Sequence, residues 1–548
     1  MDRLVIRGGT VVDGTGAPGY AADVAVEADR IVEIGPNLSG DDTLDALGCV
    51  VAPGFVDIHT HYDAQVFWDP ALTPSSFHGV TTVVAGNCGF SLSPTRPVDR
   101  DLVGRTMEKV EDMDPECLAE GIPWDEFETF PQYLDCVRRR GSALNFAAYI
   151  GHTPVRLYVM REDASDRAAK PDEIAEMVGL VEEAMDAGAA GFATSRAITH
   201  LGADGRPIPS RVAEREELEA LFGAVGRSGR GVVAVNGGEG FGFTDCYKVQ
   251  PQIGAPITYT ALLTFPGGGH MKAVDIHRRN REQGADVWPQ VSCRPLSFSM
   301  TMVEPFTLNT NPVFAQLSGA SLDDRRAAFA NPAWRDQVNA AWTLPPRWQT
   351  FEIMESAKHP ELVGRTVTDI AAARGAEPLD VLLDLAVDDL EGLRVKTIIA
   401  NDDEEGISVL LNEPGCALGL SDAGAHVGQL CDAPLPTDLL GPWVRDRQVM
   451  SLEKAVHKLT QEPANLFGFA GRGVLQPGAY ADIVVFDPAT VGPGPLRRVR
   501  DFPADTARLT ADAPTGMRHL LVNGTATRID EAQRAVRAGR VVSPSRRG

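Results

Sequence analysis

The sequence predicts an α/β fold in which a closed (β/α)8, TIM-like barrel carries a small β-sandwich domain built from both termini. Through the middle of the 548-residue chain, short apolar segments alternate with helical patterns. Eight such strand–helix units are the number that closes a parallel barrel. Both ends of the chain instead carry β-branched segments broken by Gly and Asp, which indicates strands and turns.

The β domain is expected over residues 1–52 together with 470–548. Neither end of the chain is long enough to bury one face of a sheet alone, so we expect the two ends to form one domain. The segments predicted as its strands are 4–6, 10–14, 23–26, 30–34, 481–486 and 520–524.

The barrel is expected over residues 53–469. A helix is predicted from Pro171, where acidic residues follow in the first turn, to Gly188. The intervals 89–144 and 293–350 are too long for simple crossovers, so they are predicted to be insertions with extra helices or lids over the barrel mouth. The predicted barrel strands are 55–61, 80–87, 145–151, 190–195, 232–236, 257–263, 286–292 and 417–422.

Composition excludes several classes of protein. The chain has 75 acidic against 51 basic residues, a net charge of −24 and no basic block, so it is not expected to bind nucleic acid or an anionic membrane surface. It has no apolar run long enough to span a membrane and no signal-peptide pattern at its first residues, so a cytoplasmic location is expected. Eight cysteines in so long a chain do not form a disulfide framework. An enzyme acting on a small molecule is the class that remains.

The most informative segment is His59-Thr60-His61, at the end of the first barrel strand. Strand alternation places the two imidazoles on one face, about 6.6 Å apart along the strand, so both can reach one metal ion. The alternative is a pair of packing or surface histidines.

Two further residues end barrel strands. Cys88 follows the second strand, where a thiolate would face the same barrel mouth and bind zinc; the alternative is an inert buried thiol. Asp422 ends the eighth strand, where a carboxylate can bind a metal and take a proton from a metal-bound water. The alternative for Asp422 is an ordinary helix N-cap.

These motifs resemble those of the amidohydrolase superfamily of metal-dependent hydrolases. Residues 53–61 match its first metal-binding motif, and residues 62–63, 86–89, 150–153, 420–424 and the tail 460–487 are similar to its D-aminoacylase branch. The resemblance covers nearly the whole chain. It implies a (β/α)8 barrel with a split terminal β domain, deacylation of N-acyl-D-amino acids, Cys88 as a zinc ligand and Asp422 as the catalytic acid and base. It also implies a homo-oligomer.

The chain departs from this family at two strands. The family usually supplies one metal-binding histidine from the fifth strand and one from the sixth. Here the fifth strand leads through Asn236 to Glu239, and Tyr259-Thr260 stand at the end of the sixth. We therefore expect one Zn²⁺ or other divalent ion per chain, held by His59, His61, Cys88 and Asp422, rather than two ions.

Several polar residues near strand ends are candidates for an additional ligand or for a supporting role. The alternative for each histidine among them is a hydrogen-bonded structural residue. For a substrate carboxylate, Arg196 and Arg294 follow the fourth and seventh strands and offer bidentate guanidinium groups; the alternative is an ordinary surface arginine. The candidate ligands are His152, His200, His270, Glu239 and His426.

The predicted function is that of a metal-dependent amidohydrolase that cleaves the amide C–N bond of an N-acyl amino acid, with D configuration favoured, or of a related small amide. Two alternatives stay open. The changed fifth and sixth strands are also compatible with a cyclic-amide hydrolase or a non-hydrolytic metal enzyme, or with a degenerate homologue that keeps the barrel as a scaffold.

Overall fold

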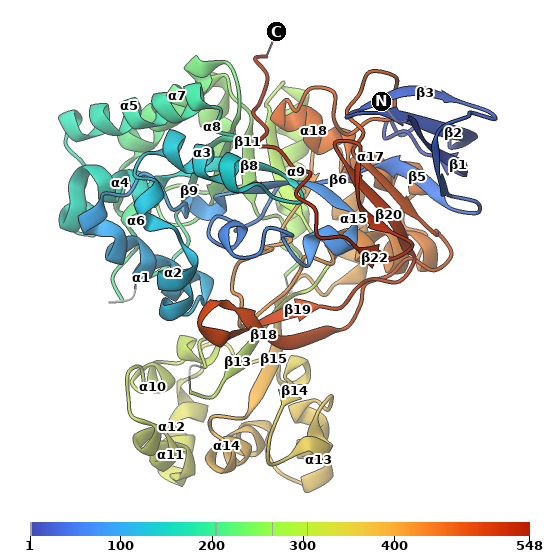
Figure 1. The fold of residues 1–548 in the computed structure, drawn as a ribbon. Coiled ribbons are helices and arrows are strands. Elements are labelled where there is room, and N and C mark those ends of the chain that lie inside the picture. Colours follow the sequence, from blue (N-terminus) through green and yellow to red (C-terminus); the bar gives the residue numbers. More distant parts are fainter. Residues whose placement is uncertain (1–2, 203–204, 266, 304, 548) are drawn as a thin grey trace. The chain divides into compact units, whose positions relative to one another are not determined.

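The computed structural model describes residues 3–202, 205–265, 267–303 and 305–547. Two compact units make up the chain (Figure 1). Unit 1 comprises Met1–Arg294 and Asp403–Gly548, and unit 2 comprises Pro295–Asp402.

Unit 1 contains the barrel, and all eight predicted barrel strands are present. They pair in parallel in the order of the sequence. An isolated parallel bridge between Thr60 and Ala423 joins the ends of the first and last strands, so the sheet closes on itself. The fold class predicted from the alternating pattern is therefore confirmed. The strands are β6 (Phe55–Asp57), β7 (Val80–Ala85), β8 (Asn145–Gly151), β9 (Gly191–Ser195), β10 (Val232–Asn236), β11 (Ile257–Thr260), β12 (Val287–Val291) and β16 (Ala417–Leu418).

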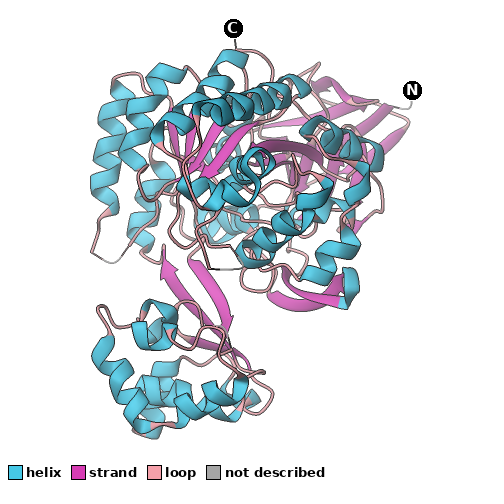
Figure 2. Cartoon of the chain, turned by 90° about the vertical axis from the view of Figure 1, so that its left-hand side faces the viewer, coloured by secondary structure: helices cyan, strands magenta, loops and turns pink. Residues whose placement is uncertain are grey.

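Helices cover the outside of the barrel strands (Figure 2). The helix predicted from Pro171 is α5 (Pro171–Ala187), and Gly188 ends it in the left-handed conformation, with φ of 103°. Its buried side chains, which include Met177 and Val181, recur at helical spacing and face the sheet. The other α-helices of unit 1 outside the first insertion are α4 (His152–Met160), α6 (Pro209–Val212), α7 (Arg215–Ser228), α8 (Phe243–Ile253), α9 (His270–Glu282), α15 (Glu404–Asn412), α16 (Leu435–Asp438), α17 (Leu452–Leu459) and α18 (Gln461–Phe467).

The two ends of the chain meet in one nine-stranded sheet, seen as blue and red strands side by side in Figure 1. Strand β5 (Val50–Pro53) pairs antiparallel with β17 (Ile483–Phe486), which joins the N-terminal to the C-terminal segment. Apolar side chains from both ends, such as Ile6 and Leu521, share one buried core. The remaining strands are β1 (Arg3–Val11), β2 (Tyr20–Glu27), β3 (Arg30–Gly35), β4 (Asp42–Asp45), β20 (Met517–Val522), β21 (Thr525–Ile529) and β22 (Ala532–Gln533), with a separate pair β18 (Leu496–Phe502) and β19 (Thr506–Ala511).

The interval predicted as the first insertion, 89–144, carries helices α1 (Arg100–Glu111), α2 (Pro115–Gly121) and α3 (Phe130–Arg140). Helix α1 ends beside the segment that follows the last barrel strand, because the amide of Val427 donates to the carbonyl of Glu111 at 3.0 Å. No helix among the described residues is both long enough and apolar enough to cross a membrane.

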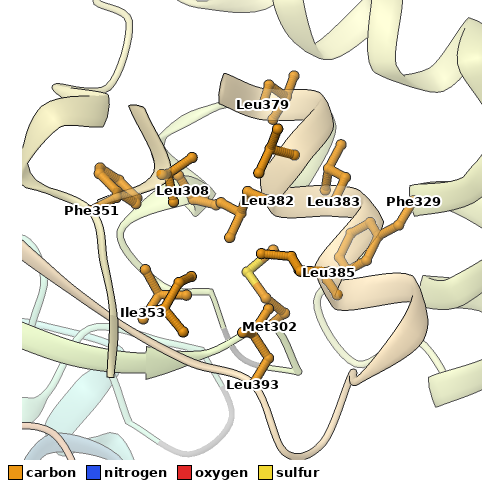
Figure 3. Close-up of a cluster of buried hydrophobic side chains, with 14 of the residues drawn as sticks. Met302, Leu308, Phe329, Phe351, Ile353, Leu379, Leu382, Leu383, Leu385 and Leu393 are labelled. Atoms are coloured by element: carbon orange, nitrogen blue, oxygen red, sulfur yellow. The ribbon is translucent and has the colours of Figure 1, made fainter. Parts of the chain in front are cut away.

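Unit 2 lies between β12 and β16 in the sequence and has a core of its own (Figure 3). Leucines of α14 (Pro378–Asp388) pack with Phe351 and Ile353. This unit continues well past the predicted insertion 293–350, because β15 (Arg394–Ala400) pairs with both β13 (Leu296–Thr301) and β14 (Glu352–Glu355). That long-range pairing leaves no local signal in the sequence. Its other helices are α10 (Pro312–Ala315), α11 (Leu322–Ala330), α12 (Pro332–Ala341) and α13 (Val367–Arg374).

Candidate metal centre

Two backbone contacts bring the histidine pair to the end of the last barrel strand. The amide of His61 donates to the carbonyl of Ala423 at 2.7 Å, and the hydroxyl of Ser421 donates to the carbonyl of His59 at 2.9 Å. Both imidazoles are buried, and their ring centroids lie 5.5 Å apart. Oδ1 of Asp422 lies 3.0 Å from Nε2 of His59 and 3.7 Å from Nε2 of His61. Residues about 360 positions apart in the sequence therefore face one point at the barrel mouth.

The turn that carries Asp422 is closely packed and conformationally unusual. Asp422 has a φ of 43°, in the left-handed region that non-glycine residues seldom adopt. At Gly424, with φ of 90°, a Cβ atom would lie 2.8 Å from the carbonyl oxygen of His61, so only glycine fits. Such backbone conformations persist where the surrounding structure holds them, and they are concentrated at functional sites.

A second turn places Cys88. The side-chain amide of Asn87 donates to the carbonyls of Ile58, Thr60 and Val84 at 3.3, 3.2 and 2.9 Å, which ties the end of β7 to the segment after β6. Cys88 then takes a φ of 55° and places its Sγ 3.8 Å from Nε2 of His59.

The ligand atoms of His59, His61 and Cys88 all lie within 4.8 Å of one another, as those of a group that can hold a metal ion do. Two imidazoles and a thiolate, with the nearby carboxylate of Asp422, are a donor set that suits zinc in tetrahedral coordination. The residues present therefore fit a zinc-like ion.

The charges at this site are strongly coupled. Burial lowers the pKa of His59, but Asp422 and Cys88 raise it more, to about 10. Burial raises the pKa of Cys88, whereas hydrogen bonds with His59 and His61 lower it below its usual value. Burial also raises the pKa of Asp422, yet the same two histidines hold it below its usual range. The thiolate and the carboxylate, which are the forms that bind metals, are thus favoured opposite two protonated imidazoles, and a bound cation would take the place of those protons.

Three residues that the sequence analysis did not single out surround the site. Oε1 of Gln290 lies 2.6 Å from Nδ1 of His59, and the amide of Asn236 donates to Sγ of Cys88 at 3.4 Å. Oε1 of Glu111 lies 2.9 Å from Nδ1 of His61, close enough for an ion pair although not aligned as a hydrogen bond. Asn236 and Gln290 are polar residues on predicted strands, and that position in the sequence could have identified them as candidates. Glu111 lies in an insertion and carries no such signal.

Among the other predicted candidates, His152 is engaged elsewhere. Its Nδ1 lies 2.8 Å from Oγ1 of Thr194, and its Nε2 lies 2.7 Å from Oε1 of Glu217. Arg156 pairs with the other carboxylate oxygen of Glu217, and all three side chains of this network are fully buried. Because both nitrogens of His152 already have partners, the structure does not offer it as a ligand.

Both arginines predicted to bind a substrate carboxylate contact the protein itself. The guanidinium of Arg196 donates to the backbone carbonyls of Ser210, Ala213 and Glu239. Arg294 pairs with Asp432 at 2.7 Å and with Asp438. These contacts account for the positions of both side chains, so neither arginine is presented as an open anion-binding group.

The remaining candidates differ in their position. His200 lies near the centre, with its Nδ1 2.8 Å from the hydroxyl of Ser195, and burial together with the charge of His426 lowers its pKa to about 4. His426 lies in the turn after Asp422, with φ of 46°. His270 is buried at the start of α9, and the side chain of Glu239 is 75% exposed, 3.6 Å from Arg211. The structure thus places His200 and His426 around the centre, and Glu239 toward solvent.

Known proteins resemble this chain along nearly its whole length. The sequence profile of the Amidohydrolase family matches residues 42–542. The chain is 31% identical to a D-aminoacylase of Alcaligenes xylosoxydans xylosoxydans, over 98% of this chain and 97% of that protein. The structure of an N-acyl-D-glutamate deacylase from Bordetella bronchiseptica, complexed with zinc and a phosphonate inhibitor, superposes with a TM-score of 0.70 at 28% identity, covering 98% of this chain and 99% of that one.

A D-aminoacylase structure with a binuclear metal centre superposes with a TM-score of 0.67 at 27% identity, again over 98% of this chain and 99% of that one. The resemblance read from the motifs is therefore confirmed. The chain belongs to the amidohydrolase family, and it is a hydrolase of carbon–nitrogen bonds other than peptide bonds.

Proposed function

We propose that the protein hydrolyses the amide bond of an N-acyl-D-amino acid, using one zinc ion held by His59, His61 and Cys88, with Asp422 beside the ion as the base. The observation that carries this proposal is the meeting of three ligand atoms within 4.8 Å, with the Asp422 carboxylate 3.0 Å from the nearest of them. The substrate class follows from the similarity to a D-aminoacylase and an N-acyl-D-glutamate deacylase over nearly the full chain.

When bound, the zinc ion supplies a Lewis acid that polarises the amide carbonyl and lowers the pKa of water toward 7. Asp422 is the base: its carboxylate takes the proton of the attacking water and then delivers that proton to the leaving amine nitrogen. His59 and His61 hold their Nε2 atoms toward Asp422, so the base and the metal ligands share one face. Gln290, through its contact with Nδ1 of His59, keeps that imidazole in this orientation.

A single ion is proposed because the fifth and sixth barrel strands do not end in histidines. Asn236 ends β10 and donates to Cys88, and Thr260 ends β11. Neither side chain is an imidazole. Among the described residues, one group of three or more His, Cys, Asp or Glu side chains meets the distances that a metal ion requires.

Elemental analysis combined with a substrate panel tests this proposal. We expect about one zinc per chain and release of the free amino acid from N-acyl-D substrates in preference to N-acyl-L substrates. Cyclic amides belong in the same panel, because the changed fifth and sixth strands leave that chemistry as the alternative. A native protein that purifies without metal and hydrolyses no member of the panel would contradict the proposal and favour a non-catalytic scaffold.

A further inference from the structure

Glu111, the last residue of α1, is an unusual carboxylate. Its side chain is 1% exposed, and neither of its oxygens makes a hydrogen bond. A buried carboxylate without hydrogen bonds is costly unless a positive charge lies close to it. The placement of Glu111 therefore calls for a cationic partner.

That partner is at the metal centre. Oε1 of Glu111 lies 2.9 Å from Nδ1 of His61, whereas Nε2 of the same imidazole lies 3.7 Å from Oδ1 of Asp422. His59 is arranged in the same way, with Nδ1 at Gln290 and Nε2 at Asp422. Each imidazole thus has one nitrogen directed to the centre and the other beside a side-chain oxygen. Of these two oxygens, only the one on Glu111 belongs to a charged group.

The backbone keeps this carboxylate in place. The carbonyl of Glu111 accepts a hydrogen bond from the amide of Val427, five residues after Asp422, and Asp112 then ends the helix with φ of 54°. The end of α1 is thereby tied to the same segment that carries the proposed base. A carboxylate whose backbone is held in this way can orient a neighbouring ring.

We propose that Glu111 is a positioning residue of the metal centre: its charged carboxylate, 2.9 Å from Nδ1 of His61, favours the tautomer with the proton on Nδ1, so that Nε2 is the nitrogen that binds the ion. The insertion between the second and third barrel strands thus contributes to the metal centre through α1. This inference rests on the proposed role of His61 as a ligand. A carboxylate beside a ligand imidazole fixes the tautomer and makes the ligand more basic, and its loss weakens metal binding by about 10- to 100-fold.

Glu111→Gln tests the inference, because it removes the charge and keeps the shape. Glu108→Gln is the matched control, since Glu108 lies one turn earlier on the same helix and is only partly buried. The measurements are the zinc dissociation constant by chelator competition and the visible absorption spectrum of the cobalt-loaded protein. We expect Glu111→Gln to weaken zinc binding by about 10- to 100-fold and to change the cobalt spectrum. We expect Glu108→Gln to do neither, and Glu111→Asp, which keeps the charge, to restore part of the affinity.

The outcomes separate this inference from the proposed function. Native affinity and a native cobalt spectrum in Glu111→Gln would overturn the role of Glu111 and leave the metal centre itself standing. Equal losses in Glu111→Gln and Glu108→Gln would also overturn it, because the effect would then be general to the helix. A native protein that binds neither zinc nor cobalt would overturn both proposals. The melting temperature of each metal-free variant shows whether that variant is folded. If Glu111→Gln is not folded, Glu111→Asp is compared with the native protein instead.

Discussion

Replacing Glu217 by Gln should destabilise the protein strongly without removing its metal. Glu217 is fully buried and shares its two carboxylate oxygens between Nε2 of His152 and the guanidinium of Arg156. The substitution conserves shape but leaves the positive charge of Arg156 buried without an anion. The backbone carbonyls of Ala164 and Arg167, at 2.9 to 3.3 Å, remain as its acceptors.

The magnitude follows from the two contacts that are lost. A hydrogen bond to a charged group contributes about 1.5–3 kcal/mol, and removing one member of a buried ion pair costs about 3–5 kcal/mol. We therefore expect the free energy of unfolding of unit 1 to fall by about 3–5 kcal/mol, at the top of the range for a single substitution. Glu219→Gln is the matched control, because Glu219 lies on the same helix and pairs with Arg215 at the surface, where loss of a pair costs under about 1 kcal/mol.

The pH dependence of the loss of unfolding free energy in Glu217→Gln is a second test. Burial raises the pKa of Glu217, but His152 and Arg156 lower it by more, so the folded-state pKa lies below the usual value. A depressed carboxyl pKa contributes stability that is fully present above the unfolded pKa of about 4.3 and is lost as the pH falls through the folded pKa. The deficit of Glu217→Gln should therefore be constant between about pH 5 and pH 8 and shrink in more acidic solution.

Urea denaturation, followed by tryptophan fluorescence and circular dichroism, measures both effects, and elemental analysis accompanies it. Unfolding of Glu217→Gln at the same urea concentration as Glu219→Gln would refute the stabilising role of the buried Glu217 carboxylate. Loss of zinc from a folded Glu217→Gln protein would contradict the structural role of His152 and make this histidine a contributor to the metal centre.

Four further predictions concern the centre and the whole molecule. Asp422→Asn should lower kcat by about 10²- to 10⁴-fold with a smaller loss of zinc, because the proton carrier is removed while both histidines stay; near-native turnover would make Asp422 a turn residue only. The double variant His59→Ala, His61→Ala should purify with negligible metal, and unchanged zinc content by elemental analysis would place the ion elsewhere. Asp389→Asn, in unit 2, should destabilise that unit by about 1–3 kcal/mol, because Asp389 accepts from the Ser356 hydroxyl and from the amides of Ala357 and Lys358; an unshifted unfolding transition would contradict this. Light scattering at micromolar concentration should give the mass of a homo-oligomer, and a strictly monomeric mass would refute the expectation drawn from the family.

The sequence by itself was sufficient for the architecture of the barrel and for proposing four residues at its mouth. The strands could be predicted because a buried parallel strand is a continuous apolar run with recognisable ends, and this pattern is local in the sequence. Four candidate residues could be predicted because each lies at the end of such an apolar run, and the carboxyl ends of parallel strands meet at the mouth of the barrel. These residues are His59, His61, Cys88 and Asp422.

The tertiary structure alone decided which other polar residues belong to that mouth and which belong to the protein's framework. His152, Arg196 and Arg294 follow barrel strands as the proposed ligands do, but each is engaged by partners from distant segments. Glu111 has no strand before it and reaches His61 only through the path of α1 across the insertion. The limits of unit 2 are likewise set by the pairing of β15 with strands more than 35 residues away. Local patterns report which face of an element is apolar, whereas the partner of a buried polar group depends on segments brought together from far along the chain.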